Sequence, residues 1–173
     1  RIIGSTGNPD DVILQNTATI NGNAGHKTIT VNNRDAFVAN LTIRNAKLRN
    51  ISGVAGLVMG TDGGTVSNCV IRDNYHNPSY YQASAGVHMS AGLVTHCIVT
   101  NNSIDVKSTV ENDAMGVMMS GGALENSFIG ANRVTNNGAG KCFAIRATGG
   151  RIVNCDIIGN DLSSTNELAG ALD

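Results

Sequence analysis

The stretch "GGTVSNCVIRDN" (residues 63–74) decides the fold, because the chain repeats its order of residue types. The later copies are "AGLVTHCIVTNN" (residues 91–102), "GGALENSFIGAN" (121–132) and "GGRIVNCDIIGN" (149–160). Each begins with small turn-forming residues, continues with apolar residues at alternate positions and ends in asparagine. Repeats of this length are typical of stacked structural units. We therefore expect each copy to form one layer of a stack.

The residue before each cysteine, or its equivalent, gives the register of the repeat. These residues are 28, 28, 30 and 28 positions apart: Asn40, Asn68, His96, Asn126 and Asn154. Apolar residues recur at fixed offsets from them in two columns: Val38, Val66, Val94, Leu124 and Ile152; Ile43, Ile71, Val99, Ile129 and Ile157. Further upstream two more apolar columns lie two residues apart: Ile29, Leu57, Val87, Val117 and Ile145; Val31, Met59, Met89, Met119 and Ala147. Alternation with a period of two, rich in β-branched residues, predicts short strands rather than helices.

This pattern predicts an all-β fold, a right-handed parallel β-helix. We expect about six rungs of roughly 28–30 residues with three short strands each, in a single domain over residues 1–173. Leucine-rich repeats are shorter and carry a different signature, and helical repeats need a 3.6-residue period. Like side chains should stack on like inside such a coil.

Two kinds of turn residue follow from this register. Small residues and glycine, as in "SAG" (residues 90–92), should form the turn before the second strand, since glycine adopts positive φ easily. The column at Asn40, Asn68, His96, Asn126 and Asn154 should form the next bend, since asparagine tolerates the left-handed region. Its amides can hydrogen-bond from rung to rung as a ladder, which His96 interrupts. The predicted core stacks are Cys69, Cys97, Ser127 and Cys155, and Met59, Met89 and Met119.

Composition narrows the class of protein. The chain has 173 residues, is 41% hydrophobic and carries a net charge of −1, which favours a globular protein and gives no electrostatic reason to expect a nucleic-acid partner. No apolar run approaches the roughly 20 residues of a membrane span, so no direct membrane insertion is expected. Of the four cysteines, none forms a CxxC pair, and we expect free thiols in the core and no metal or other cofactor.

The rungs resemble the β-helix regions of bacterial cell-surface and secreted proteins, including autotransporter passengers and polymorphic outer-membrane proteins. The opening "GSTGNPDDVILQN" (residues 4–16) and the "GG-x-[VIL]-x-N-[CS]" pattern carry this resemblance. "GGALENSFIGAN" is loosely similar to the GGA(I/L) and F-x-x-N motifs of polymorphic outer-membrane proteins, although its last spacing is one residue longer. The resemblance implies a pectin-lyase-like fold and an extracellular or cell-surface location.

The same fold also carries polysaccharide lyases and glycoside hydrolases, which makes an enzyme the main alternative. Hydrolysis needs two carboxyl groups about 5–10 Å apart. The predicted outward column of the first strand holds no carboxylate: Thr30, Val58, His88, Met118 and Arg146. That of the third strand holds one, Asp156. We therefore predict no catalytic residues, and keep as alternative a carbohydrate-active fragment whose catalytic rungs lie elsewhere.

Two surfaces are candidates for binding. Tyr75, His76, Tyr80 and Tyr81 gather in a predicted connection loop, where aromatic rings can contact sugars or pack over the coil. Val70, Ile98 and Phe128 should form an outward apolar strip, which we expect a connection loop or a neighbouring molecule to cover.

The ends of the sequence, "RIIG" and "NELAGALD", read as strands without a capping helix. We expect either more rungs in a longer protein or end-to-end stacking into a fibre, because an open solenoid end leaves backbone groups unpaired. The function expected is a non-catalytic extracellular structural or adhesive solenoid. Its expected partners are further copies of the chain, a host or cell-surface receptor, or a glycan.

Overall fold

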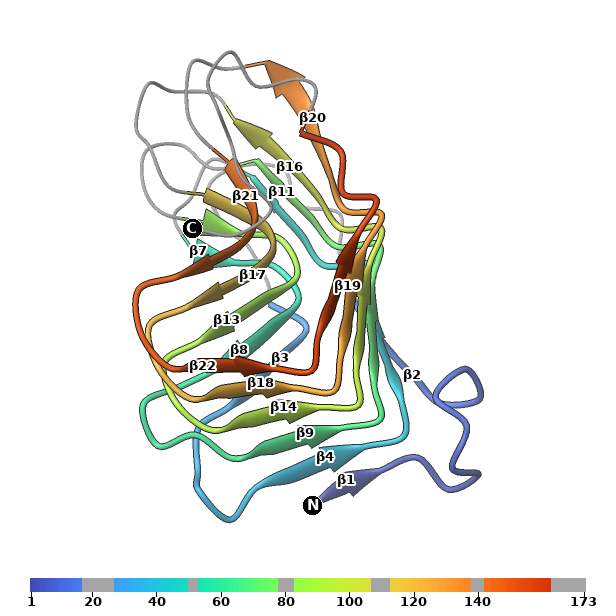
Figure 1. Cartoon of the computed structure of the whole chain (residues 1–173). Helices are drawn as coiled ribbons and strands as arrows, with labels where there is room; N and C mark the ends of the chain where they lie inside the picture. Colours follow the sequence, from blue (N-terminus) through green and yellow to red (C-terminus); the bar gives the residue numbers. More distant parts are fainter. Residues whose placement is uncertain (17–26, 50–52, 78–82, 107–112, 138–141, 163–173) are drawn as a thin grey trace.

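The computed structural model describes residues 1–16, 27–49, 53–77, 83–106, 113–137 and 142–162. Every regular element in these ranges is a β-strand, and all strand pairs are parallel. The strands stack into a coil, and Figure 1 shows the rows of successive turns lying one over another. The predicted parallel β-helix is therefore confirmed.

Each turn of the coil passes through sheets that we name C, A, B and D in chain order. Sheet C contains β3 (Ile29–Val31), β7 (Gly53–Val54), β8 (Leu57–Met59), β12 (Ala83–Ser84), β13 (Val87–Met89), β17 (Asp113–Met119) and β21 (Cys142–Ala147). Sheet A contains β1 (Ile2–Ile3), β4 (Phe37–Ala39), β9 (Thr65–Ser67), β14 (Leu93–Thr95), β18 (Ala123–Glu125) and β22 (Arg151–Val153).

The other two sheets complete the turn. Sheet B contains β2 (Ile13–Gln15), β5 (Thr42–Arg44), β10 (Val70–Arg72), β15 (Ile98–Thr100), β19 (Phe128–Gly130) and β23 (Asp156–Ile158). Sheet D contains β6 (Lys47–Arg49), β11 (Tyr75–Asn77), β16 (Ser103–Val106) and β20 (Arg133–Asn137). Sheet D begins inside what the sequence pattern assigns to the variable connection, so the chain remains ordered beyond the third predicted strand.

The number of turns is smaller than predicted. Sheets A and B have six strands each, but sheet D has four, and the coil completes about four turns. The prediction of six rungs counts the rows of sheets A and B. Their first and last rows have no strand of sheet D among the described residues.

The first corner, between sheets A and B, is built as the pattern predicts. Asn40, Asn68, His96, Asn126 and Asn154 all have φ between 47° and 58°, the left-handed region in which asparagine is tolerated. In the turn between sheets C and A, Gly92 has φ 86°. A Cβ at Gly92 would lie 2.8 Å from Met59 Cε of the preceding turn. That glycine therefore supplies both the turn conformation and the space for the methionine.

Apolar columns fill the coil. Met59, Met89 and Met119 pair in register along sheet C and are almost completely buried. Cys69 and Cys97 are buried in the same hydrophobic cluster, Ser127 occupies the next place in their column, and Cys155 at the last described turn is partly exposed. The register of the core is thus the one that the sequence columns indicate.

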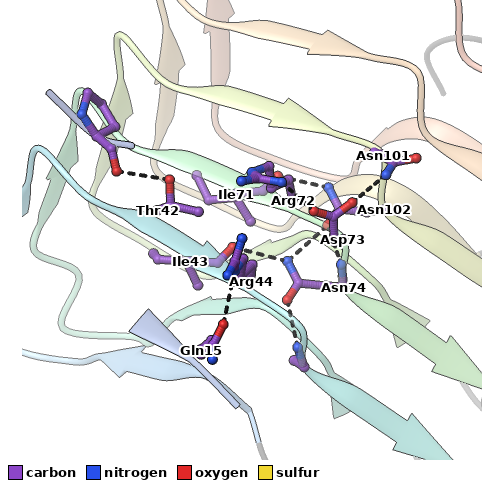
Figure 2. A network of polar contacts seen from close by, with 12 residues as sticks. Gln15, Thr42, Ile43, Arg44, Ile71, Arg72, Asp73, Asn74, Asn101 and Asn102 are labelled. Carbon is purple, nitrogen blue, oxygen red and sulfur yellow. Dashed lines mark hydrogen bonds and ion pairs between the residues drawn. The ribbon is translucent and has the colours of Figure 1, made fainter. Parts of the chain in front are cut away.

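A second column of asparagines lies inside the coil, where sheet B turns into sheet D. We name Asn74, Asn102, Asn132 and Asn160 the inner ladder. The Asn102 amide Nδ2 donates to Ile71 O of the preceding turn at 3.0 Å and to Asn132 Oδ1 of the next at 2.9 Å. Asn102 Oδ1 accepts from the Asn74 amide at 2.9 Å and from Asn74 backbone N at 3.1 Å. Figure 2 shows Asn74 and Asn102 in this arrangement.

Glycine makes room for the inner ladder on the opposite wall. A Cβ at Gly86, between β12 and β13 of sheet C, would lie 2.4 Å from Gly116 O and 3.1 Å from Asn102 Nδ2. Gly56 and Gly116 hold the same place in the neighbouring turns, with Asn74 and Asn132 opposite them. The inner ladder therefore requires glycine at the facing positions of the opposite wall, where a side chain would collide with the backbone or crowd the asparagine amides.

Replacing Asn102 with Asp tests the inner ladder. A carboxylate cannot donate to Ile71 O or Asn132 Oδ1, and it would bury a charge, so we expect the free energy of unfolding to fall by about 2–4 kcal/mol at pH 7. Burial raises the folded-state pKa of the new carboxyl above its unfolded value. The loss should therefore shrink as pH falls through that folded pKa, because the neutral acid regains a donor. Urea unfolding at pH 7 and at about pH 4, just above where an exposed aspartate titrates, measures it.

Asn68→Gly is the matched control at the first corner. Glycine keeps the positive φ, and only exposed bonds, to Asn40 and to Gly7 O, are lost, so the expected loss is about 1 kcal/mol or less. Equal losses in both variants would contradict a special role for the inner ladder.

Candidate functional site

The predicted tyrosine loop is in part a strand. Tyr75 and His76 lie on β11, and Tyr80 and Tyr81 lie outside the described residues. His76 is fully buried inside the coil, between Leu48 and Ile104 of the adjacent turns. Tyr75 and His76 therefore lie in a strand rather than in the predicted connection loop, and alternation along β11 turns His76 inward. Tyr75 lies on the outer face of sheet D.

The outer face of sheet D carries a polar cluster centred on Asp105. Tyr75 Oη donates to Asp105 Oδ2 at 2.7 Å, and Asn77 Nδ2 donates to the same oxygen at 2.9 Å. The Thr135 hydroxyl donates to Asp105 Oδ1. Thr135 reaches it because the register of β16 and β20 shifts after Ile104. Three turns are thereby joined through one carboxylate.

This arrangement defines what the cluster can do. Asp105 is held by three donors, so it is poorly placed to act as a base toward a ligand. The Arg49 guanidinium lies 5.9 Å from the centre of the Tyr75 ring, within the range of a cation–π contact. Burial, and then the hydrogen bond to Asp105, raises the pKa of the Tyr75 phenol. The cluster therefore links three turns on the outer surface of sheet D, and the Tyr75 ring is in contact with Arg49.

A second brace lies at the corner between sheets B and D, which Figure 2 shows from close by. Arg72 Nη1 lies 2.7 Å from Asp73 Oδ2, and Asn101 Nδ2 donates to Asp73 Oδ1 from the next turn. Asp73 and Asn101 have φ of 56° and 52°, which turns their side chains away from the inner ladder. The polar groups of Arg72, Asp73 and Asn101 are thus hydrogen-bonded or ion-paired to one another.

The first corner offers the open site. A depression of about 440 Å³ is lined by backbone and side chains of three successive turns: His96, Cys97, Ile98, Asn126, Ser127, Phe128, Asn154 and Asp156. We name it the corner groove. Its floor combines the asparagine column of the corner with the outward column of sheet B. Ile98 and Phe128 are 43% and 36% exposed, so they supply an apolar surface in this groove.

Polar groups fix the walls of the corner groove. His96 Nδ1 and Thr95 Oγ1 are 2.9 Å apart and share a hydrogen bond, which holds the imidazole ring at the corner. Asn154 Nδ2 donates to Asn126 Oδ1 at 3.4 Å. The outer asparagine column therefore forms pairs on either side of His96, as the sequence column indicates.

The chain itself covers the earlier part of the same corner. In the N-terminal loop (residues 5–11), Gly7 O accepts from Asn68 Nδ2 at 3.1 Å and Pro9 O accepts from Thr42 Oγ1 at 3.0 Å. Thr42 is fully buried as a result, and Val70 one turn later is half-buried. The loop ends short of Ile98 and Phe128, so cover of this strip by another molecule stays a prediction.

Known proteins give no further assignment. No family model, no curated protein and no solved structure matches the chain. In the ranges that the structure describes, no helix is long and apolar enough to cross a membrane, and no three His, Cys, Asp or Glu side chains are grouped to hold a metal ion. The likeness to autotransporter passengers and polymorphic outer-membrane proteins therefore depends on the sequence motifs alone.

The four cysteines provide a test of the register. All are free thiols: Cys69, Cys97 and Cys142 are buried, and Cys155 is partly exposed. Burial raises the pKa of Cys142 and of Cys155. With a thiol reagent we expect only Cys155 to react in the native protein, with a rate that still rises above pH 9. All four should react without reductant after denaturation.

The variant Cys155→Ser should remove the native reaction and leave three thiols in the denatured chain. A rapid native reaction at Cys97 or Cys142 would show that the core columns are placed wrongly.

Proposed function

We propose that the chain is a non-catalytic extracellular structural and adhesive β-solenoid, which acts at a bacterial cell surface or in a fibre. One observation carries this proposal: the inner ladder is the same in successive turns, whereas the outward columns differ from turn to turn. A constant, hydrogen-bonded interior suits a rigid rod, and a varied exterior suits recognition. The resemblance to bacterial surface proteins supports the extracellular location.

The outward acidic groups also support a structural rather than a hydrolytic role. Asp105 is bound by three donors, and the neighbours of Asp156 in its column are Phe128 and Ile98. A glycoside hydrolase needs two carboxyl groups that face each other across the bond. The alternative stays a carbohydrate-active fragment without its catalytic rungs, because neither Asp105 nor Asp156 supplies such a pair.

Two measurements test the proposal. We expect no release of reducing ends or unsaturated products from pectin or alginate, at neutral pH and with or without calcium. We also expect the backbone N–H groups of Asn74, Asn102 and Asn132 to be strongly and similarly protected in hydrogen exchange, because each donates to the asparagine of the next turn. Product release would favour the enzyme, and fast exchange in any one turn would contradict a uniform rod.

A further inference from the structure

We propose that the corner groove is a docking site for a short turn-forming segment of another polypeptide, one that presents backbone carbonyls, an apolar side chain and a lysine or arginine. The inference rests on the proposed adhesive function and names the chemistry of the partner. Its starting point is the way in which the N-terminal loop packs on the same corner.

The N-terminal loop shows how this corner receives a polypeptide. It contacts the coil through the carbonyls of Gly7 and Pro9, two residues apart, which accept from Asn68 Nδ2 and Thr42 Oγ1. Internal hydrogen bonds shape the loop, such as Asn8 Nδ2 to Asp11 Oδ1 at 3.2 Å. A compact turn therefore docks by its backbone on one asparagine and one outward residue of sheet B.

The corner groove continues these two columns. Asn126 and Asn154 take the place of Asn68 in later turns, so amide groups that can bond a partner's carbonyls recur. The outward column changes along the stack, from Thr42 through Val70 to Ile98, Phe128 and Asp156. The Thr42 hydroxyl, which donates to the N-terminal loop, is thus replaced in later turns by the apolar side chains of Ile98 and Phe128. The carboxylate of Asp156 follows them.

These replacements define the partner. Ile98 and Phe128 favour an apolar side chain, and the exposed Asp156 favours a cation at the far end of the groove. Gly130 lets the Phe128 ring lie along the strand, since a Cβ there would be 2.4 Å from Phe128 Cζ. A groove of about 440 Å³ accepts a few residues rather than the face of a folded domain. A peptide turn is favoured over a glycan because the structure shows a peptide turn on the adjoining part.

The test uses a nine-residue peptide with the sequence of residues 4–12, in which Leu replaces Asp10 and Lys replaces Val12, so that the Asn8–Asp11 hydrogen bond of the loop is kept. The unmodified peptide, with both aspartates, is its matched control. Titrations of the whole chain followed by NMR shifts should show the substituted peptide binding at least about fivefold more tightly. The shifts should map to His96, Ile98 and Asn126. Phe128→Ser should weaken that binding by about tenfold.

Asp156→Lys gives the decisive comparison, because it changes an exposed charge and leaves the apolar surface intact. It should reverse the preference and favour the unmodified, acidic peptide. Asp62→Lys, an exposed charge in the turn between sheets C and A, should leave the preference unchanged. Circular dichroism of each variant shows whether the coil is folded, and the charge reversal remains a test if Phe128→Ser fails to fold.

Three results would overturn the docking proposal. The first is equal binding of the two peptides to the native chain and to Asp156→Lys. The second is an oligogalacturonate that occupies the groove and excludes the peptide. The third is sedimentation in which two copies cover the groove with each other and Ile98→Ser separates them. None of these results contradicts the proposed non-catalytic function, provided that the chain releases no products from pectin or alginate. Cleavage of those polymers would instead remove the proposed function, whatever the peptides do.

Discussion

The inner ladder is the interaction on which the rest of the coil depends. A parallel coil must turn sharply between sheets, and each turn leaves backbone groups that the strand ladders cannot satisfy. Each inner asparagine meets this need in two directions: Asn102 donates to a carbonyl of the preceding turn and to the asparagine of the following one. Removing water from such amides is favourable only when all their hydrogen bonds are made. The ladder therefore fixes the spacing and register of the turns together.

That constraint extends across the coil. Because the amides of the inner ladder lie close to the backbone of sheet C, the facing positions must lack a side chain, as at Gly86. The methionine column lies in sheet C, with turn glycines such as Gly92 next to it. The interior consequently admits few changes. Variation is left to the outward positions, where Thr42, Ile98 and Asp156 share one column but have different chemistry.

The sequence predicted those parts of the fold in which a repeated residue type meets a specific structural requirement. Alternation of apolar residues predicts the strands, and the first asparagine column predicts a left-handed bend, because few other residues accept positive φ. The inner ladder was harder to recognise: its asparagines end each sequence copy and look like loop residues. The signal was present, since Asn74, Asn102 and Asn132 recur with the same spacing as the first column. His76 was placed in a loop because the third strand was expected to be the last of each turn. The chain instead forms a fourth strand, β11, whose alternation turns His76 inward.

The two asparagine columns show why the corner groove arises where it does. At the second corner a residue such as Asp73 takes the positive φ, and the asparagine that follows points inward, where the turns on both sides satisfy it. At the first corner the asparagine itself takes the positive φ and points outward, so the preceding turn, which accepts one hydrogen bond from its amide nitrogen, satisfies only part of the amide. Asn68 completes its bonding with a carbonyl of the N-terminal loop. The same backbone solution that closes the coil therefore leaves a row of amide groups along one edge, and a polypeptide carbonyl is their natural acceptor.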